Sequence, residues 1–158
     1  MIKCRLEKLG WRCLSMKMDL ANLKAILDVF VDSDKSFVKV ASDIIPKYPV
    51  GCLHNFSFHY LMLVEEGYIC AANSRALYNA SKAGFSGLSD LPGDDCKPLY
   101  FDAEVSLTKS GFEFASALGK PDIFERLKEI SSEPISVIKD VSKELAVGYI
   151  KQKCGISV

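Results

Sequence analysis

The chain has 158 residues, of which 49% are hydrophobic and 25% are charged, and this composition is ordinary for a globular protein with one buried core. Its formal net charge is zero, which gives no support for a strongly nucleic-acid-binding protein. The apolar runs are short and interrupted, and the N-terminus lacks the apolar stretch of a secretory signal. We therefore expect a cytoplasmic protein with no membrane segment, whose six cysteines are mostly buried, reduced thiols.

Residues 1–17 are interpreted as a basic N-terminal extension, because five basic residues accompany one acidic residue there. Three forms of this extension stay open: a helix that packs on the domain or on a second copy, a basic arm on an anionic surface, and a poorly ordered segment. The opposite sign of charge gathers in residues 53–106, where three basic residues accompany seven acidic ones.

A helix, a short strand and a short helix are expected next. Apolar residues repeat at helical spacing from Asp19, a suitable N-cap residue, to Phe30. Residues 36–40 alternate, which predicts a short edge strand. Residues 44–48 predict a short helix with a polar cap at residue 42 or 43 and Pro46 in its first turn.

The best-marked helix of the chain covers residues 53–66 and ends at Gly67, which suits a left-handed helix end. At about 100° per residue its apolar residues cluster on one side. This core side consists of Leu53, Phe56, Tyr60, Leu63 and Val64. The outward side carries His54, Asn55, Phe58, Met62 and Glu65, with His59 and Glu66 at its flanks.

Two strands joined by a long loop follow the marked helix and together predict a wing. The first strand begins at residues 68–72, and residues 99–101 with 104–107 form the returning strand. Residues 81–97 between them contain three glycines, one proline and several aspartates, which is typical of a loop.

Three helices are expected after the wing. Thr108 is expected to cap the first, and Gly111 to let its first turn lie close to the preceding strand. Pro121 starts the second helix and Ser132 caps the third, a long amphipathic helix. The core side of the first of these helices is predicted to consist of Phe112, Ala115 and Leu118.

The order of these elements resembles the winged helix-turn-helix fold, and two local phrases support the likeness. Residues 66–69 (EGYI) resemble the exit from the third helix of that fold, and residues 107–111 (LTKSG) resemble the phrase after the wing in many bacterial regulators. We therefore predict an α+β fold with a winged helix-turn-helix core over residues 18–118, a long wing, and a C-terminal helical extension over residues 119–158.

A narrower resemblance covers about residues 16–155. Residues 16–20 (MKMDL), 59–69 (HYLMLVEEGYI) and 107–114 (LTKSGFEF), followed by the helical tail, are similar to a family of short uncharacterised proteins of bacteria and their prophages. The resemblance implies a winged-helix-like fold and a mobile-element origin, and it brings no catalytic residue or ligand. Residues 1–15 and the long wing loop depart from the family's pattern.

Double-stranded DNA is one partner that the outward side of the marked helix could contact. Asn55 could read adenine, and His59 could contact bases or phosphates. The helix itself has no Lys or Arg. Phosphate neutralisation would therefore depend on the N-terminal extension and on Arg75, Lys82, Lys39 and Lys47.

Protein is the other partner, and it is favoured because Phe58 and Met62 on the same side suit a protein interface. The interface would serve self-association or a host or phage protein. The outward side would be unavailable to either partner if the C-terminal helices covered it. We expect a non-enzymatic module that acts through protein contacts, with a DNA-binding regulator as the alternative.

No catalytic, cofactor or metal site is predicted. Residues 84–87 (GFSG) lack the Lys of a phosphate-binding loop. The spacing of Cys52 and His54 is not usual for zinc, and His54 and His59 do not share one side of a helix.

Overall fold

The computed structural model describes residues 17–73, 75, 77–90 and 96–156. The predicted basic extension therefore lies, except for Lys17, outside the described residues. The described chain is an α+β protein with two small antiparallel sheets, and the predicted fold class is confirmed at that level. Within this part of the chain, no helix is long and apolar enough to cross a membrane.

The first helix begins where its sequence predicts. Helix α1 covers Leu20–Val31, and the Asp19 carboxylate accepts a hydrogen bond from the Ala21 amide at 2.8 Å. This bond satisfies one of the free amides at the helix start. Strand β1 (Val38–Lys39) follows the turn after α1.

The short helix expected over residues 44–48 is a 3-10 helix, η2 (Ile45–Lys47), with Pro46 in its first turn as predicted. A π-helical segment, η1 (Val40–Ile44), precedes it. Ser42 does not cap a helix: its amide donates to the Asp102 carboxylate at 2.8 Å, and its hydroxyl donates to the same group. These hydrogen bonds lower the pKa of Asp102. The predicted cap at Ser42 is wrong because this residue is held by Asp102, far away in the sequence, and the alternative cap Asp43 accepts from the Lys39 amide instead.

Helix α2 (Leu53–Glu65) is the marked helix, and Gly67 ends it as predicted. Gly67 has a φ of 74°, a conformation that glycine adopts readily. Its amide donates to the Val64 carbonyl at 3.1 Å, and the Tyr68 amide donates to the Leu63 carbonyl at 2.9 Å. This is the Schellman pattern, and it turns the chain from helix into strand.

The main sheet has three short strands in the order β1-β5-β2, and both pairs are antiparallel. Strand β2 covers Ile69–Ala71 and strand β5 covers Glu104–Leu107. Val105 lies opposite Val38 on one side and Ala71 on the other, and it is completely buried. The sheet therefore joins β1, which precedes α2, to β5 and β2, which follow α2, with β5 in the centre.

A separate hairpin is inserted between β2 and β5, and part of it was predicted to be loop. Strand β3 (Phe85–Leu88) pairs with strand β4 (Pro98–Tyr100). The register shifts between Phe85 and Gly87, and Gly87 has a φ of 129°. A glycine at such a bulge weakens the local strand signal, so this strand depends on its partner and not on its own sequence.

Helix α3 (Lys109–Leu118) is capped as predicted, but its core side is shifted. Phe112 is 59% exposed, while Phe114 is buried and stacks on Tyr68 with ring centroids 4.9 Å apart. The prediction that Phe112 belongs to the core is therefore wrong. The helix lies against the sheet on the side of Phe114 because Tyr68 offers a flat aromatic partner there.

Thr108 ties the start of α3 to the end of α2. Its hydroxyl donates to the Gly67 carbonyl at 2.6 Å and accepts from the Gly111 amide at 3.1 Å. We expect Thr108→Ala to lower the free energy of unfolding by about 1–2 kcal/mol, as for other lost N-caps. Chemical denaturation measures this change. Thr108→Ser keeps the hydroxyl and should recover most of the loss; equal losses in both variants would contradict this account.

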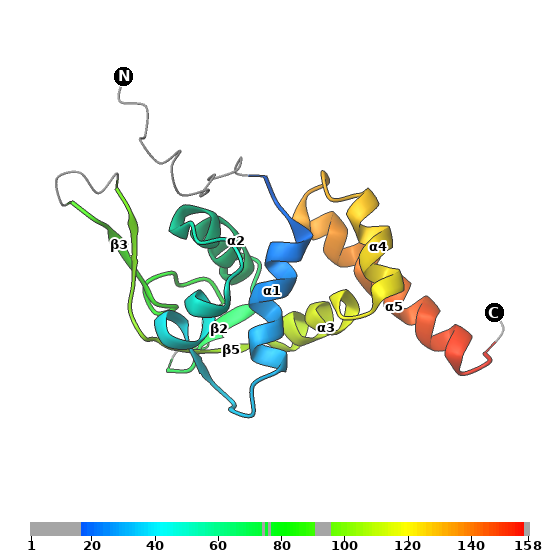
Figure 1. The fold of residues 1–158 in the computed structure, drawn as a ribbon. Coiled ribbons are helices and arrows are strands. Elements are labelled where there is room, and N and C mark those ends of the chain that lie inside the picture. The colour runs from blue at the N-terminus through cyan, green and yellow to red at the C-terminus, as the bar shows by residue number, and fades with distance from the viewer. Residues whose placement is uncertain (1–16, 74, 76, 91–95, 157–158) are drawn as a thin grey trace, which may run out of the picture.

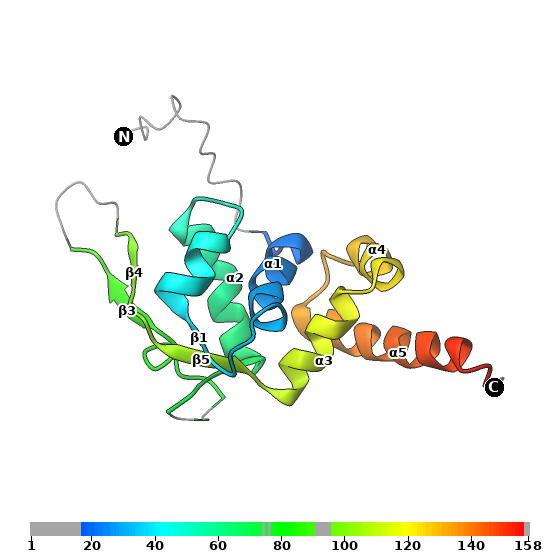
Figure 2. The same cartoon turned by 60° about the horizontal axis from the view of Figure 1, so that its bottom comes forward.

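Two further helices complete the fold. Helix α4 covers Pro121–Glu129 and helix α5 covers Ile135–Lys153. Pro134 and not Ser132 precedes α5, so the predicted cap is wrong. Helix α5 packs against α3 and α4, and both views place it on the far side of α1 and α3 from α2 (Figures 1 and 2). The C-terminal helices therefore do not cover the outward side of α2.

Candidate interaction surface

The hairpin of β3 and β4 is held against α2 by one aromatic side chain. The Tyr100 ring lies edge-on to the rings of Phe56 and Tyr60, with centroids 5.3 and 5.9 Å away. Its hydroxyl is 2.8 Å from the Ser57 hydroxyl, and burial raises the pKa of Tyr100 to about 12. Tyr60 in turn donates to the Ala83 carbonyl at 2.7 Å. These contacts fix which side of the hairpin faces inward.

The other side of the hairpin is apolar and exposed. Because side chains alternate along a strand, Leu99 and Phe101 lie opposite to Tyr100, and they are 44% and 47% exposed. Leu88 on the paired strand is also exposed, but it lies opposite Pro98 and therefore on the same side as Tyr100. We call Leu99 and Phe101 the outer hairpin surface. This surface was not predicted, although the alternation of Leu99, Tyr100 and Phe101 in the sequence is the signal that could have shown it.

Asn55, predicted on the outward side of α2, and His59, predicted at its flank, do not lie at the surface, so both placements are wrong. Both are buried, Asn55 with 4% and His59 with none of its surface exposed. The Asp19 amide donates to His59 Nε2 at 2.9 Å, and Asn55 Oδ1 accepts from the side chains of Asn22 and Tyr48. These hydrogen bonds join α1, η2 and α2. Helical angles misplaced these two residues because they do not show that α1 covers this side of α2.

Phe58 and Met62 are only partly exposed. The Phe58 ring lies edge-on to the His59 ring at 5.1 Å, and Met62 packs against the core. On α2 only Glu65 is fully exposed. The outward side of α2 is therefore a narrow strip with two half-buried apolar side chains and an acidic end.

The two predicted basic contacts are not on α2 but in the segment between β2 and β3. Arg75 and Lys82 are both exposed. The Lys82 amide donates to the Asn79 side chain at 3.0 Å in the turn before β3. The structure therefore does not bring these cations together with Asn55 and His59, which are buried in the helical layer.

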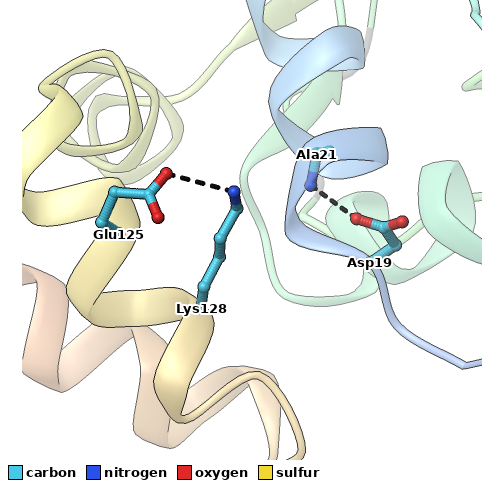
Figure 3. A network of polar contacts seen from close by, with 4 residues as sticks. All are labelled: Asp19, Ala21, Glu125 and Lys128. Carbon is cyan, nitrogen blue, oxygen red and sulfur yellow. Dashed lines mark hydrogen bonds and ion pairs between the residues drawn. The ribbon is translucent and has the colours of Figure 1, made fainter.

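A hollow of about 420 Å³ lies between the start of α1 and the end of α4. Figure 3 shows the polar groups beside it: the Asp19 cap with the Ala21 amide, and Lys128 paired with Glu125 at 3.1 Å. Asn55 also lines the hollow, but its oxygen is already hydrogen-bonded to Asn22 and Tyr48. These contacts cap a helix and join helices, so each of them has a structural role.

The cysteines were expected to be mostly buried, reduced thiols. Among the described residues Cys70 is a buried free thiol, whereas Cys96 and Cys154 are exposed free thiols. The expectation of burial is therefore wrong for these two residues.

Comparison of the chain with protein-family models, curated proteins and solved structures found no match. The family resemblance and its implied mobile-element origin stay predictions.

Proposed function

We propose that the domain is a winged helix-turn-helix whose function is to bind a protein, without catalysis. The order of elements supports the fold: β1 lies between α1 and α2, and β1 pairs with β5, the last strand. Helix α2 then corresponds to the third helix of that fold, and the hairpin of β3 and β4 occupies the position of the wing.

One observation carries the choice of protein as partner: the outer hairpin surface is apolar. A wing that contacts DNA lies against phosphates, which bind Lys and Arg. Here the outer hairpin surface presents the apolar side chains Leu99 and Phe101, although the exposed Lys97 lies two residues before Leu99. Large exposed apolar side chains next to one another are typical of protein interfaces.

The outward strip of α2 agrees with this choice. A recognition helix needs exposed polar side chains that reach base edges, but Asn55 is buried and Glu65 would repel phosphate. Phe58 and Met62 are half-buried and extend the apolar character of the strip. The expected partner therefore offers apolar side chains to the hairpin and a basic group to the acidic end of α2.

The test compares a double variant of the hairpin with a single variant of α3, and both variants replace exposed apolar side chains by aspartate. Leu99→Asp combined with Phe101→Asp places two charges on the outer hairpin surface, and Phe112→Asp places one on exposed α3. Immobilised wild-type protein and Phe112→Asp should retain one partner protein from a lysate of the source cells, and the double variant should lose it. Failure of the wild type to retain a partner, or retention by the double variant, would contradict the proposal.

A duplex of random sequence tests the DNA alternative in the same preparation. We expect no binding at low salt. Binding that weakens steeply with salt, and weakens further in Arg75→Glu or Lys82→Glu, would instead establish the DNA-binding function. The far-UV circular dichroism of each variant should match the wild type, because all the substituted side chains are exposed or on loops.

A further inference from the structure

Asn55 on α2 has a side-chain nitrogen that the fold leaves unused. The side chain lines the hollow between α1 and α4, and only 4% of the residue is exposed. Its Oδ1 accepts hydrogen bonds from the Asn22 side chain and the Tyr48 hydroxyl. Within the described chain, no group accepts a hydrogen bond from its Nδ2. Two donors of a buried amide therefore remain available.

The neighbouring His59 ring fixes which end of this amide faces Tyr48. The Asp19 amide donates to His59 Nε2 at 2.9 Å, so the proton of the neutral ring is on Nδ1. The Tyr48 hydroxyl, 3.2 Å from Nδ1, therefore donates to Asn55 Oδ1 and not to the ring. This bond directs Oδ1 towards Tyr48 and leaves Nδ2 on the other branch of the amide.

The unused nitrogen is open to the hollow and is not sealed in the core. In the part of the chain that the structure describes, the fully buried side-chain nitrogen or oxygen without a partner is the Tyr68 hydroxyl. Asn55 Nδ2 therefore still touches open space, and the open space that Asn55 lines is the hollow. A donor in this position favours a ligand with an acceptor oxygen, because a buried amide without a hydrogen bond is unfavourable.

Cations outnumber anions around the hollow. Its charged lining residues are Lys17, Lys128 and Asp19, which gives a net charge of 2 − 1 = +1. One carboxylate oxygen of Asp19 already accepts the cap bond of α1. Lys128 lies between Glu125 and the start of α1 (Figure 3), and its ion pair with Glu125 is exposed to water and therefore weak. An anionic oxygen in the hollow thus faces the Asn55 amide and two ammonium groups.

The size and the other walls of the hollow point to a small, singly charged molecule. Its volume of about 420 Å³ is within the range of small-molecule pockets. A carboxylate carries one charge and matches the net charge of +1, whereas a phosphate monoester carries nearly two. The remaining walls are partly apolar and suit a short hydrocarbon body. The apolar lining residues are Met18, Leu20 and Val50.

We propose that this hollow binds a small hydrocarbon carboxylate. One carboxylate oxygen accepts a hydrogen bond from Asn55 Nδ2, and the other pairs with the ammonium groups of Lys17 and Lys128. The hydrocarbon body lies against Met18 and Val50. The site shares no residue with the outer hairpin surface, so this inference does not rest on the proposed function.

Hexanoate is the probe, and the side-chain NH2 signal of Asn55 in a ¹⁵N–¹H NMR spectrum of the full chain reports its binding directly. Hexanoate should shift this signal with a dissociation constant of about 1 mM, which a ligand of this size can reach. Acetate lacks the hydrocarbon body and hexylamine has the opposite charge, so both should bind about tenfold more weakly or worse. N-Acetylleucine, which mimics a peptide end, should also bind more weakly; tighter binding would overturn the assignment to a small hydrocarbon acid.

Asn55→Asp is the critical variant, because it keeps the oxygen that Tyr48 and Asn22 use and replaces the free NH2 group by an acceptor. The affinity for hexanoate, followed through the Asn22 side-chain signal, should fall about tenfold or more. Two further variants test the site if Asn55→Asp does not fold. Lys17→Gln combined with Lys128→Gln removes both ammonium groups, and Val50→Trp fills the hollow; each should weaken binding by a similar factor.

Lys143→Gln is the matched control, because this exposed lysine of α5 does not line the hollow, and it should bind hexanoate like the wild type. No shift of the Asn55 signal up to about 50 mM hexanoate would overturn the proposal and show that the hollow holds only water. Equal affinity for hexylamine would also overturn it, as would unchanged affinity in the folded variants of the site. Circular dichroism checks that each variant is folded.

Discussion

Gly111→Ala is expected to cause the largest loss of stability of any alanine substitution at a glycine in this domain. A Cβ at this position would lie 2.1 Å from the Tyr68 carbonyl oxygen and 2.9 Å from its carbon. Both atoms belong to the backbone, so no side-chain rotation relieves the overlap. We expect a loss of about 3 kcal/mol in the free energy of unfolding, at the upper end of overpacking costs, measured by chemical denaturation.

Gly148→Ala is the matched control, because the same methyl group meets nothing within 4 Å there. In dilute, monomeric protein it should raise stability by about 0.5–1 kcal/mol through helix propensity. The contrast separates the close approach of α3 to Tyr68 from the general effect of replacing glycine. Two variants of similar stability would show that α3 does not lie against the Tyr68 carbonyl.

His59→Leu is expected to have the second-largest effect. The ring accepts from the Asp19 amide through Nε2, and its Nδ1 lies 2.9 Å from the Asn55 carbonyl. The first bond requires a bare Nε2, so Nδ1 carries the proton and donates to Asn55. Leucine fills similar space but leaves the Asp19 amide without its acceptor, whereas the Asn55 carbonyl keeps its bond within α2, so the expected loss is about 1–3 kcal/mol.

His59→Gln provides the comparison for His59→Leu. The glutamine amide oxygen can take over the bond from the Asp19 amide, so this variant should lose clearly less stability at pH 8. If both variants lose the same amount, the polar contacts of His59 do not contribute to stability and only its volume matters.

Acid should destabilise the protein through the same side chain. Burial lowers the pKa of His59, although the hydrogen bond to Asn55 and the nearby Asp19 charge act in the opposite direction. Below pH 6.5 His59 is therefore protonated in the unfolded chain but stays neutral in the folded protein. The free energy of unfolding then falls as the pH decreases from 6.5 towards the pKa of folded His59. The slope from one such group cannot exceed about 1.4 kcal/mol per pH unit.

The difference in stability between wild type and His59→Gln isolates this effect from other titrating groups. It should be constant above pH 7 and should shrink as the pH decreases from 6.5 to 5. A difference that stays constant over that range would show that folded His59 takes up a proton as readily as the unfolded chain.

The local elements were predictable wherever a short-range signal sets them. Asp19 and Thr108 have side chains that accept from amides two or three residues away, and Gly67 adopts the left-handed conformation of a helix end. Such features depend on neighbours in the sequence, so spacing and residue type are sufficient to find them. The close approach of the first turn of α3 to the Tyr68 backbone was also predicted, because Gly111 has no side chain.

The candidate site was less predictable, because exposure depends on contacts between distant segments. Helical angles give the outward side of α2, but they cannot show that α1 covers Asn55 and His59 there. Likewise, β3 depends on pairing with β4, and the exposed positions of Leu99 and Phe101 follow from the packing of Tyr100. The sequence by itself thus determined where helices and turns begin and end. Only the tertiary structure decided which sides remain exposed, because burial is set by the long-range packing of whole elements.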